Sequence, residues 1–332
     1  MGVVIGKLRG LQQISDAAGF FTICAIDHRG SLQRALNPDN PKAVGYQAMV
    51  DFKLDLCRAV VPVASAVLLD PVYGAAPAIA AGVLPGSRGL LVSLEKTGYS
   101  GGAEARVSEL LPDWGVPKIK RMGASAVKLL VYYRPDVGEA ARRKLDLIAG
   151  VADECLRADI PLLVEPVSYP VGIEVDDRSL FARRKPELVI ETARQITELP
   201  IDVLKAEFPV DLNFEDDEGR LLELCRQLGA AARTPWVLLS AGIDFVHFRK
   251  QVEIACRAGA SGFLAGRALW QEAAGMQPPA ARRQFFEEVA APRLQELSEL
   301  VHRYGCPWMA RPDLAPGGYD AVFEGWYRSY GS

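Results

Sequence analysis

The chain has 332 residues, of which 49% are hydrophobic and 24% are charged, and its formal net charge is −3 at pH 7. This is the composition of an ordinary globular protein, and it excludes an intrinsically disordered chain. Because neither sign of charge dominates, it also argues against binding to nucleic acid or to an anionic membrane surface. We find no signal-peptide pattern and no apolar run of the roughly 20 residues that span a bilayer, so we expect a cytoplasmic protein without membrane contact.

The cysteines and histidines form no metal-binding pattern. The six cysteines occur in no CxxC pair and lie far in sequence from the three histidines. We interpret them as buried, reduced thiols of a cytoplasmic protein. His28, His247 and His302 show no ligand spacing, whereas a catalytic zinc ion needs several such ligands together. The sequence therefore predicts neither a metal nor a cofactor.

Short apolar segments recur along the chain, and each is followed by a stretch of helical character. Their spacing averages roughly 35 residues, which is about the size of one strand-plus-helix unit. Several are continuously apolar, as is typical of strands covered on both faces. In chain order, the expected strands are Phe21–Ile26, Ser65–Asp70, Gly89–Leu94, Ala126–Tyr132, Pro161–Glu165, Asp202–Glu207, Trp236–Ser240 and Ser261–Ala265.

Two of the intervening stretches show helical periodicity clearly. In Glu139–Ala158 the expected buried stripe is Leu145, Ile148, Ala152 and Leu156. In 245–258 the expected buried face is Val246, Val252, Ile254 and Ala255.

Eight such units without a linker predict an α/β protein with one domain over residues 1–332, a (β/α)8 barrel. The alternative is a doubly wound open sheet, for which we would expect a Gly-rich dinucleotide fingerprint that the chain lacks. We expect residues 1–18 to form a short helix that closes the bottom of the barrel. The C-terminal tail, 305–332, is rich in aromatic residues and is expected to pack on the barrel or on a neighbouring subunit.

Lys205 is the sharpest candidate for chemistry, because active sites of such barrels lie at the carboxyl ends of the strands. Side chains alternate along a strand, so Lys205 and Glu207 are expected to point into the barrel and Leu204 and Ala206 towards the helices. A lysine attacks a ketone only as the free amine, which burial and a nearby cation both favour. The alternative is a structural lysine, ion-paired within the barrel.

Two further charged residues lie inside apolar strands. Lys128 is a candidate for the cation beside Lys205, or for a contact to a substrate hydroxyl. Glu165 ends the strand between them and can carry protons during dehydration of a carbinolamine or cleavage of a carbon–carbon bond. The alternative for Glu165 is an ion pair with Lys128, and the two roles are compatible.

The first two strands end in acidic residues. Asp27 is followed by Arg29, which is expected to hold an anionic end of the substrate. Asp70 precedes Pro71, and either it contacts substrate or it caps the following helix.

The last two strands end in Ser240-Ala-Gly242 and Ala265-Gly266-Arg267. The loops after strands 7 and 8 are the usual phosphate site of this barrel, where backbone N–H groups and a helix N-terminus bind the anion. Gly242 and Gly266 allow close approach of the backbone, and Arg267 supplies a charged fork for phosphate. The alternative is that both glycines are ordinary turn residues.

With these residues assembled, the chain resembles the class I tagatose-1,6-bisphosphate aldolase family over residues 10–305. The motifs that carry the resemblance are Ala25–Gly30, Leu68–Gly74, Glu95–Tyr99, Ala126–Tyr133, Asp202–Glu207, Leu239–Gly242 and Gly266–Trp270. The resemblance implies cleavage of a ketose 1-phosphate through a Schiff base on Lys205, giving dihydroxyacetone phosphate and glyceraldehyde 3-phosphate. It implies supporting catalytic roles for Asp27, Lys128 and Glu165.

The resemblance further implies that the 1-phosphate lies at Ser240, Gly242, Gly266 and Arg267, and it suggests a homo-oligomer. The chain departs from the family at His28, where the family usually has Gln, at Pro166, and in the tail beyond residue 305. These positions bear on the identity of the substrate more than on the reaction. Two alternatives therefore stay open: a 6-deoxy-6-sulfofructose-1-phosphate aldolase, and a regulator that binds sugar phosphate without turnover.

Overall fold

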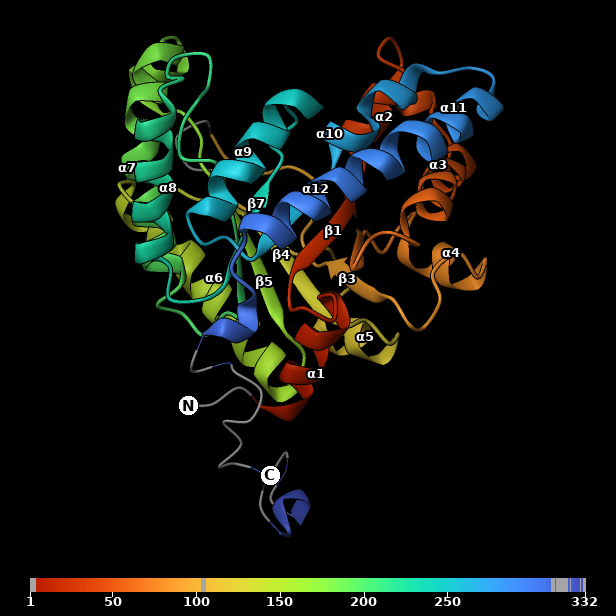
Figure 1. Cartoon of the computed structure of the whole chain (residues 1–332), viewed down its shortest axis with the longest axis horizontal. Helices are drawn as coiled ribbons and strands as arrows, with labels where there is room; N and C mark the ends of the chain where they lie inside the picture. The colour runs from red at the N-terminus through yellow and green to blue at the C-terminus, as the bar shows by residue number, and fades with distance from the viewer. Residues whose placement is uncertain are drawn as a thin grey trace.

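The computed structural model describes residues 4–102, 106–311, 314, 322, 324–328 and 330, and it contains a closed barrel of eight parallel strands with helices around it (Figure 1). Each strand pairs with the next one in the chain, and β8 pairs with β1 to close the barrel. The predicted (β/α)8 barrel is thus confirmed. The open sheet is excluded, because Phe21 of the first strand lies in register with Gly262 of the last.

The strands agree with the apolar segments of the sequence to within two residues at either end. Their bounds are β1 Phe21–Ile26, β2 Ala66–Leu69, β3 Gly89–Ser93, β4 Ala126–Tyr132, β5 Leu162–Val167, β6 Val203–Ala206, β7 Trp236–Leu239 and β8 Gly262–Ala265. The helices are α1 Ile5–Ile14, α2 Gly30–Leu36, α3 Tyr46–Val60, α4 Ala75–Ala80, α5 Val116–Arg121, α6 Gly138–Arg157, α7 Arg178–Ile196, α8 Glu218–Ala231, α9 Phe245–Arg257, α10 Arg267–Trp270, α11 Pro279–Phe285 and α12 Ala291–Tyr304.

Aspartate caps begin the three helices that follow β5, β6 and β7. The carboxylates of Asp177, Asp217 and Asp244 accept hydrogen bonds from backbone N–H groups in the first turns of α7, α8 and α9. Such caps satisfy donors that have no partner within the helix. They therefore fix where each loop at the carboxyl end of the barrel stops and its helix starts.

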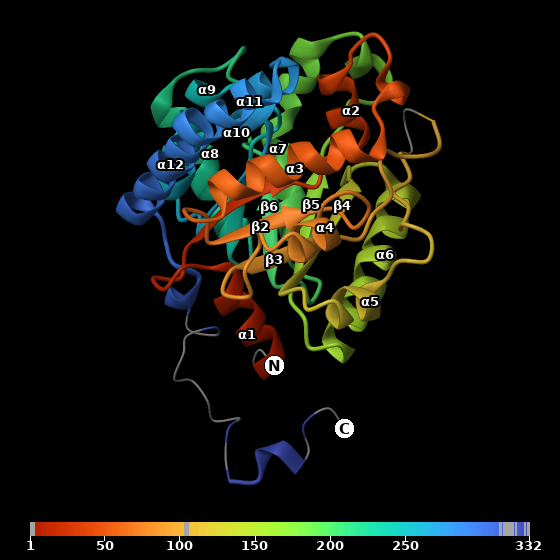
Figure 2. The same ribbon diagram turned by 90° about the vertical axis from the view of Figure 1, so that its right-hand side faces the viewer.

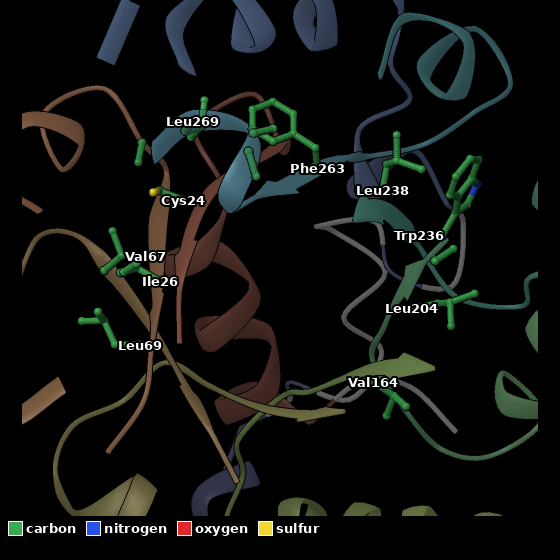
Figure 3. Close-up of a cluster of buried hydrophobic side chains, with 14 of the residues drawn as sticks. Cys24, Ile26, Val67, Leu69, Val164, Leu204, Trp236, Leu238, Phe263 and Leu269 are labelled. Atoms are coloured by element: carbon green, nitrogen blue, oxygen red, sulfur yellow. The ribbon is translucent and has the colours of Figure 1, made fainter. Parts of the chain in front are cut away.

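The hydrophobic core has two layers, which follow from the alternation of side chains along each strand. The outer layer lies between the strands and the helices, and Figure 3 shows part of it, with Val67, Leu204 and Phe263 directed away from the barrel centre. The inner layer fills the lower half of the barrel and includes Ile23 and Leu163. Both layers leave the carboxyl ends of the strands free for polar side chains.

The N-terminal helix α1 closes the bottom of the barrel, as predicted. Its Leu11 and Ile14 join the inner layer, and Figure 2 shows the helix at the end opposite to α2. The aromatic tail contacts this same end. Trp308 is buried in the inner layer and donates a hydrogen bond from Nε1 to Ser15 Oγ at 3.0 Å. Other aromatic residues of the tail 305–332, including Tyr319 and Phe323, lie outside the described residues.

Two details of the predicted helix faces are wrong. Val246 is 73% exposed, because it lies six positions before Val252 and so points about 120° away from it around α9. Leu156 is also exposed, since the buried stripe of α6 runs through Ile148, Ala152 and Cys155 instead. No helix in the described ranges is long and apolar enough to cross a membrane.

Candidate active site

A cavity of about 650 Å³ opens at the carboxyl ends of the strands. It is lined by every residue that the sequence analysis assigned to the site except Asp70: Asp27, Arg29, Lys128, Glu165, Lys205, Ser240, Gly242, Gly266 and Arg267. These residues come from segments of sequence spread over the whole chain. Their convergence is what a parallel barrel produces, because all its strands end at the same face.

Lys205 and Lys128 share one carboxylate at the centre of this cavity. Lys205 Nζ lies 2.8 Å from Glu165 Oε1, and Lys128 Nζ lies 3.0 Å from Glu165 Oε2. The inward direction predicted for Lys205 and Glu207 is confirmed, since both line the cavity while Leu204 and Ala206 belong to the outer core layer. Lys205 is only 5% exposed. A buried amine beside a single carboxylate is suited to attack on a ketone.

Lys128 has a different environment, because two more carboxylates hold it. Its Nζ lies 2.7 Å from Asp27 Oδ2 and 2.6 Å from Glu95 Oε1. Burial opposes the charge of Lys128, but Asp27, Glu165 and Glu95 raise its pKa well above the usual value. Lys128 is therefore charged at neutral pH. It holds three carboxylates at fixed positions.

The two carboxylates predicted for catalysis are ionised in this environment. Burial alone would raise the pKa of Glu165, but Lys128 and Lys205 hold it below the usual value. Burial would also raise the pKa of Asp27, but the positive charge of Lys128 holds that pKa well below its usual range. Both groups therefore carry a negative charge at neutral pH.

Sequence reasoning missed Glu95 as a site residue. It follows the apolar strand β3 and lines the cavity, as Asp27 does after β1. Its Oε2 also accepts the backbone N–H of Leu130 at 3.1 Å, which ties the end of β3 to β4. The same signal that identified Asp27, an acidic residue just past a buried strand, would have identified Glu95.

The predicted phosphate loops meet at one edge of the cavity. Gly242 has φ +78°, and a Cβ there would lie 2.3 Å from the guanidinium carbon of Arg267. Only glycine therefore lets Arg267 lie across this loop. Ser240 Oγ accepts the N–H of Gly266 at 3.3 Å, which joins the two loops. Arg34 of α2 also lines the cavity, and burial together with the charge of Arg34 lowers the pKa of Arg267.

A second group of cations borders the cavity near β3. Arg29 donates from Nη2 to the carbonyl oxygen of Glu95 at 2.5 Å, and Lys96 lines the same part of the wall. The cavity thus has positive side chains both at the β7 and β8 loops and next to β3. This arrangement fits a ligand with an anionic group at each end.

His28, which follows Asp27, also lines the cavity. Its ring packs edge-on against Trp270, with centroids 5.0 Å apart, and its Nδ1 lies 3.7 Å from Asp27 Oδ1. Burial lowers the pKa of His28 to about 4, against the opposing effect of Asp27. The imidazole is therefore neutral at pH 7 and can both donate and accept hydrogen bonds in the cavity.

The structure places Asp70 outside the cavity, where it is fully buried. Its Oδ1 accepts the N–H groups of Val72 and Tyr73 at 2.9 and 2.8 Å, in the turn that precedes α4. The N-cap of α4 is Gly74 and no side chain caps it, so the alternative that Asp70 caps the following helix is also wrong. Asp70 does not line the cavity because its carboxylate is engaged by the turn before α4 and by α3, rather than directed into the barrel. Its other oxygen is held at 2.6 Å by Lys53 Nζ.

Lys53 connects Asp70 to the first loop of the active site. This lysine of α3 also donates to the carbonyl oxygens of Ile26 and His28, at 2.5 and 2.8 Å. Those two carbonyls lie on either side of Asp27 in the chain. Lys53 therefore fixes the backbone that aims Asp27 at Lys128, although it does not itself line the cavity.

We expect Lys53→Met to lower the free energy of unfolding by about 3–5 kcal/mol, because it leaves the charge of Asp70 buried without a cation beside it. The shift is measured by urea denaturation, and Lys53→Met/Asp70→Asn should recover part of it. The matched control is Arg58→Met on the same helix, which removes an exposed side chain from Asp55 while Arg282 still pairs with that carboxylate, and it should change stability by less than about 1 kcal/mol. Equal urea midpoints for wild type and Lys53→Met would contradict this role.

The amino-acid sequence is similar to those of known aldolases. Residues 21–272 match the family model described as DeoC/LacD family aldolase. Tagatose 1,6-diphosphate aldolase 1 of Enterococcus faecalis is 35% identical, aligned over 80% of this chain and 84% of its own length. The tagatose 1,6-diphosphate aldolase of Listeria monocytogenes serotype 4b (strain F2365) is 33% identical over 92% of this chain and 94% of its own.

Among solved structures, a Schiff base-forming fructose-1,6-bisphosphate aldolase superposes with a TM-score of 0.59 at 23% identity, covering 89% of this chain and 99% of that one. A fructose-bisphosphate aldolase of Plasmodium falciparum gives a TM-score of 0.63 at 14% identity, covering 90% and 94%. At such identities these two show a shared fold. The family match and the curated relatives place the molecule among the aldolases, enzymes that cleave or form carbon–carbon bonds. The chain belongs to the DeoC/LacD family of aldolases.

Proposed function

We propose that the protein is a class I aldolase that cleaves tagatose 1,6-bisphosphate through a Schiff base on Lys205. The observation that carries the proposal is the contrast between the two central lysines. Lys128 is held as an ammonium ion by three carboxylates, whereas Glu165 is the only carboxylate in ion-pair contact with Lys205 in the described part of the chain. Only Lys205 is therefore free to become the nucleophile, once Glu165 has accepted its proton.

The reaction begins when the amine of Lys205 attacks the C2 carbonyl carbon of the open-chain ketose. Glu165, 2.8 Å from this amine, is placed to protonate the departing hydroxyl of the carbinolamine, so that water leaves and an iminium ion forms. A carboxylate of the cluster, Glu165 or Asp27, then removes the proton of the C4 hydroxyl. The C3–C4 bond breaks and its electrons pass to the iminium, giving an enamine and glyceraldehyde 3-phosphate.

The second half of the reaction returns the enzyme to its starting state. Protonation of the enamine at C3 regenerates an iminium ion, and water adds at C2 to release dihydroxyacetone phosphate and the amine of Lys205. Lys128 stays charged throughout, so its role is to hold Asp27, Glu95 and Glu165 in place and to attract the oxygens of the substrate. No metal or cofactor is needed for any step.

The two cationic edges of the cavity support a bisphosphate as substrate. We assign the 1-phosphate to Arg267 and the loops of Ser240, Gly242 and Gly266, and the 6-phosphate to the part of the wall near Arg29. The names of the relatives agree with this assignment, since they are tagatose 1,6-diphosphate aldolases. A sulfonate in place of the 6-phosphate would meet the same cations, so 6-deoxy-6-sulfofructose 1-phosphate is the substrate to compare.

The test is borohydride trapping with dihydroxyacetone phosphate, read by mass spectrometry of chymotryptic peptides. We expect a reduced adduct on the peptide that contains Lys205 and none on the peptide with Lys128. An adduct on Lys128 alone would overturn the assignment of the nucleophile. Stabilisation by the sugar phosphate, without adduct or cleavage, would indicate the regulatory binding protein instead.

Replacing Arg267 with Ala is expected to raise KM for tagatose 1,6-bisphosphate by about 10- to 100-fold while changing kcat little, because a charge-assisted contact made equally in ground and transition states is lost. Steady-state kinetics measures both constants. Cleavage of tagatose 6-phosphate, which lacks the 1-phosphate, is the control and should be as slow in the variant as in wild type. An unchanged KM for the bisphosphate would remove Arg267 from the phosphate site.

We further propose that the enzyme is cytoplasmic and forms a homo-oligomer. The cysteines support the first point, since all six are free thiols and five are buried, as suits a reducing compartment. Light scattering on the purified protein tests the second, and the mass of a single chain in solution would contradict it.

A further inference from the structure

Lys144 is a buried cation outside the active site. It lies on the buried stripe of α6, with 5% of its surface exposed. Its Nζ lies 3.2 Å from the Tyr169 hydroxyl oxygen and 5.2 Å from the centroid of that ring. In the described ranges it has no carboxylate within ion-pair distance. A lysine in such surroundings is rare unless its charge is used.

A second cation, Arg106, lies on the same ring. Its guanidinium carbon is 4.9 Å from the centroid of Tyr169, and 4.5 and 5.4 Å from those of Tyr99 and Tyr132. Its buried Nε has no hydrogen-bond partner within the described ranges, where the guanidinium also forms no ion pair. Burial and the charge of Arg106 lower the pKa of Lys144 to about 8. The positive charge of this pair is therefore not balanced by the described part of the protein.

A cavity of about 530 Å³ opens beside Lys144. Its walls are largely apolar, from Val107, Val137, Ala140 and Leu147. Arg143 and Glu139 also line it, but both side chains are exposed and their charges are paired with each other. A mostly apolar cavity of this size with a few polar groups has the character of a small-molecule site. It shares none of its lining residues with the aldolase cavity.

We propose that this cavity binds a small organic anion, with its charged head at Lys144 and its apolar body against Val137 and Leu147. The head supplies the negative charge that the pair lacks, and the body covers apolar surface that is now open to solvent. Arg106, which lies over the same Tyr169 ring as Lys144, adds a second positive charge that attracts the anion. Because Arg106 also packs on Tyr132, which lines the aldolase cavity, an occupant here is coupled to the substrate site.

The probe is 8-anilinonaphthalene-1-sulfonate, an aryl sulfonate that fluoresces when its rings leave water. We expect one saturable site per chain in the full-length wild-type protein. Lys144→Met keeps the aliphatic stem and removes the charge, and it should raise Kd at least tenfold. Lys144→Arg restores the charge and should stay within threefold of wild type. The matched control is Arg143→Met, on the same wall but already paired, which should also stay within threefold.

Two further measurements test where the dye binds and whether Lys144 holds it. Arg267→Ala should bind the dye as wild type does, because the phosphate loops are not involved; loss of binding there would place the dye in the aldolase cavity and overturn the proposal. If Lys144→Met does not fold, acetylation of wild-type Lys144 is followed by mass spectrometry. The dye should slow it relative to exposed Lys118. Equal rates with and without the dye, or a folded Lys144→Met that binds as tightly as wild type, would also overturn it.

Discussion

Lys205→Ala is expected to lower kcat/KM for tagatose 1,6-bisphosphate by on the order of 10⁵-fold or more, the scale seen when a covalent nucleophile is removed. Without the amine there is no iminium ion to accept the electrons of the C3–C4 bond. The cations of the pocket remain, so the variant should still bind the bisphosphate. Cleavage is measured by coupling the release of dihydroxyacetone phosphate to its reduction, and binding by the thermal shift with substrate.

The matched control is Lys185→Ala. Lys185 of α7 lies near the site, 3.9 Å from Glu207, but it does not line the cavity. Its loss should change kcat/KM by less than about threefold, in keeping with a weak contact at the periphery. Lys205→Ala should also resist inactivation by borohydride with dihydroxyacetone phosphate, whereas Lys185→Ala should be inactivated as fast as wild type. Near-normal turnover by the Lys205→Ala enzyme would contradict a mechanism through a Schiff base on Lys205.

The barrel could be predicted because its signal is local. Each strand is a short apolar run, and the alternation within Asp202–Glu207 is enough to turn Lys205 inwards and Leu204 outwards. The position of Glu165 between the two lysines follows from strand order, since β5 lies between β4 and β6. Parallel strands that end at one face bring such residues together without any knowledge of the loops.

The contacts of Lys53 and Asp70 could not be predicted in this way. Lys53 lies in the middle of α3, and its partners are backbone carbonyls 25 and 27 residues earlier in the chain. No periodicity marks a helix residue that reaches under a strand to bind main-chain atoms. For the same reason the sequence left open whether Asp70 contacts substrate or caps the following helix, because both alternatives begin with an acidic residue after an apolar strand.

The environment of Lys128 shows a third limit. A lysine inside an apolar strand predicts that its charge is used, but not by which groups. The sequence suggested a cation that acts on Lys205 or a contact to substrate. In the structure the ammonium group of Lys128 forms ion pairs with Asp27, Glu95 and Glu165, so the partners of its charge lie within the protein. Such a balance depends on distances between side chains from four strands, which sequence spacing does not contain.

Glu165→Gln is the second change with a large expected effect. The amide keeps the shape of the side chain but cannot carry a proton between Lys205 and the substrate. We expect kcat to fall by about 10²- to 10⁴-fold, the usual contribution of a positioned acid or base, with little change in KM. The defect should also appear in single-turnover trapping, as slower formation of the borohydride-reducible adduct with dihydroxyacetone phosphate. That result would place Glu165 in the dehydration step.

The matched comparison is Glu207→Gln, a carboxylate in the same cavity that accepts the N–H of Ser168 at 2.7 Å and makes no ion pair with Lys205 or Lys128 among the described residues. A general loss of negative charge in the cavity would slow both variants alike, since each removes one carboxylate. Proton transfer at Lys205 requires Glu165 alone, so Glu207→Gln should keep kcat within about tenfold of wild type. If both variants lose the same activity, Glu165 acts through charge, and the proton must travel through Asp27 instead.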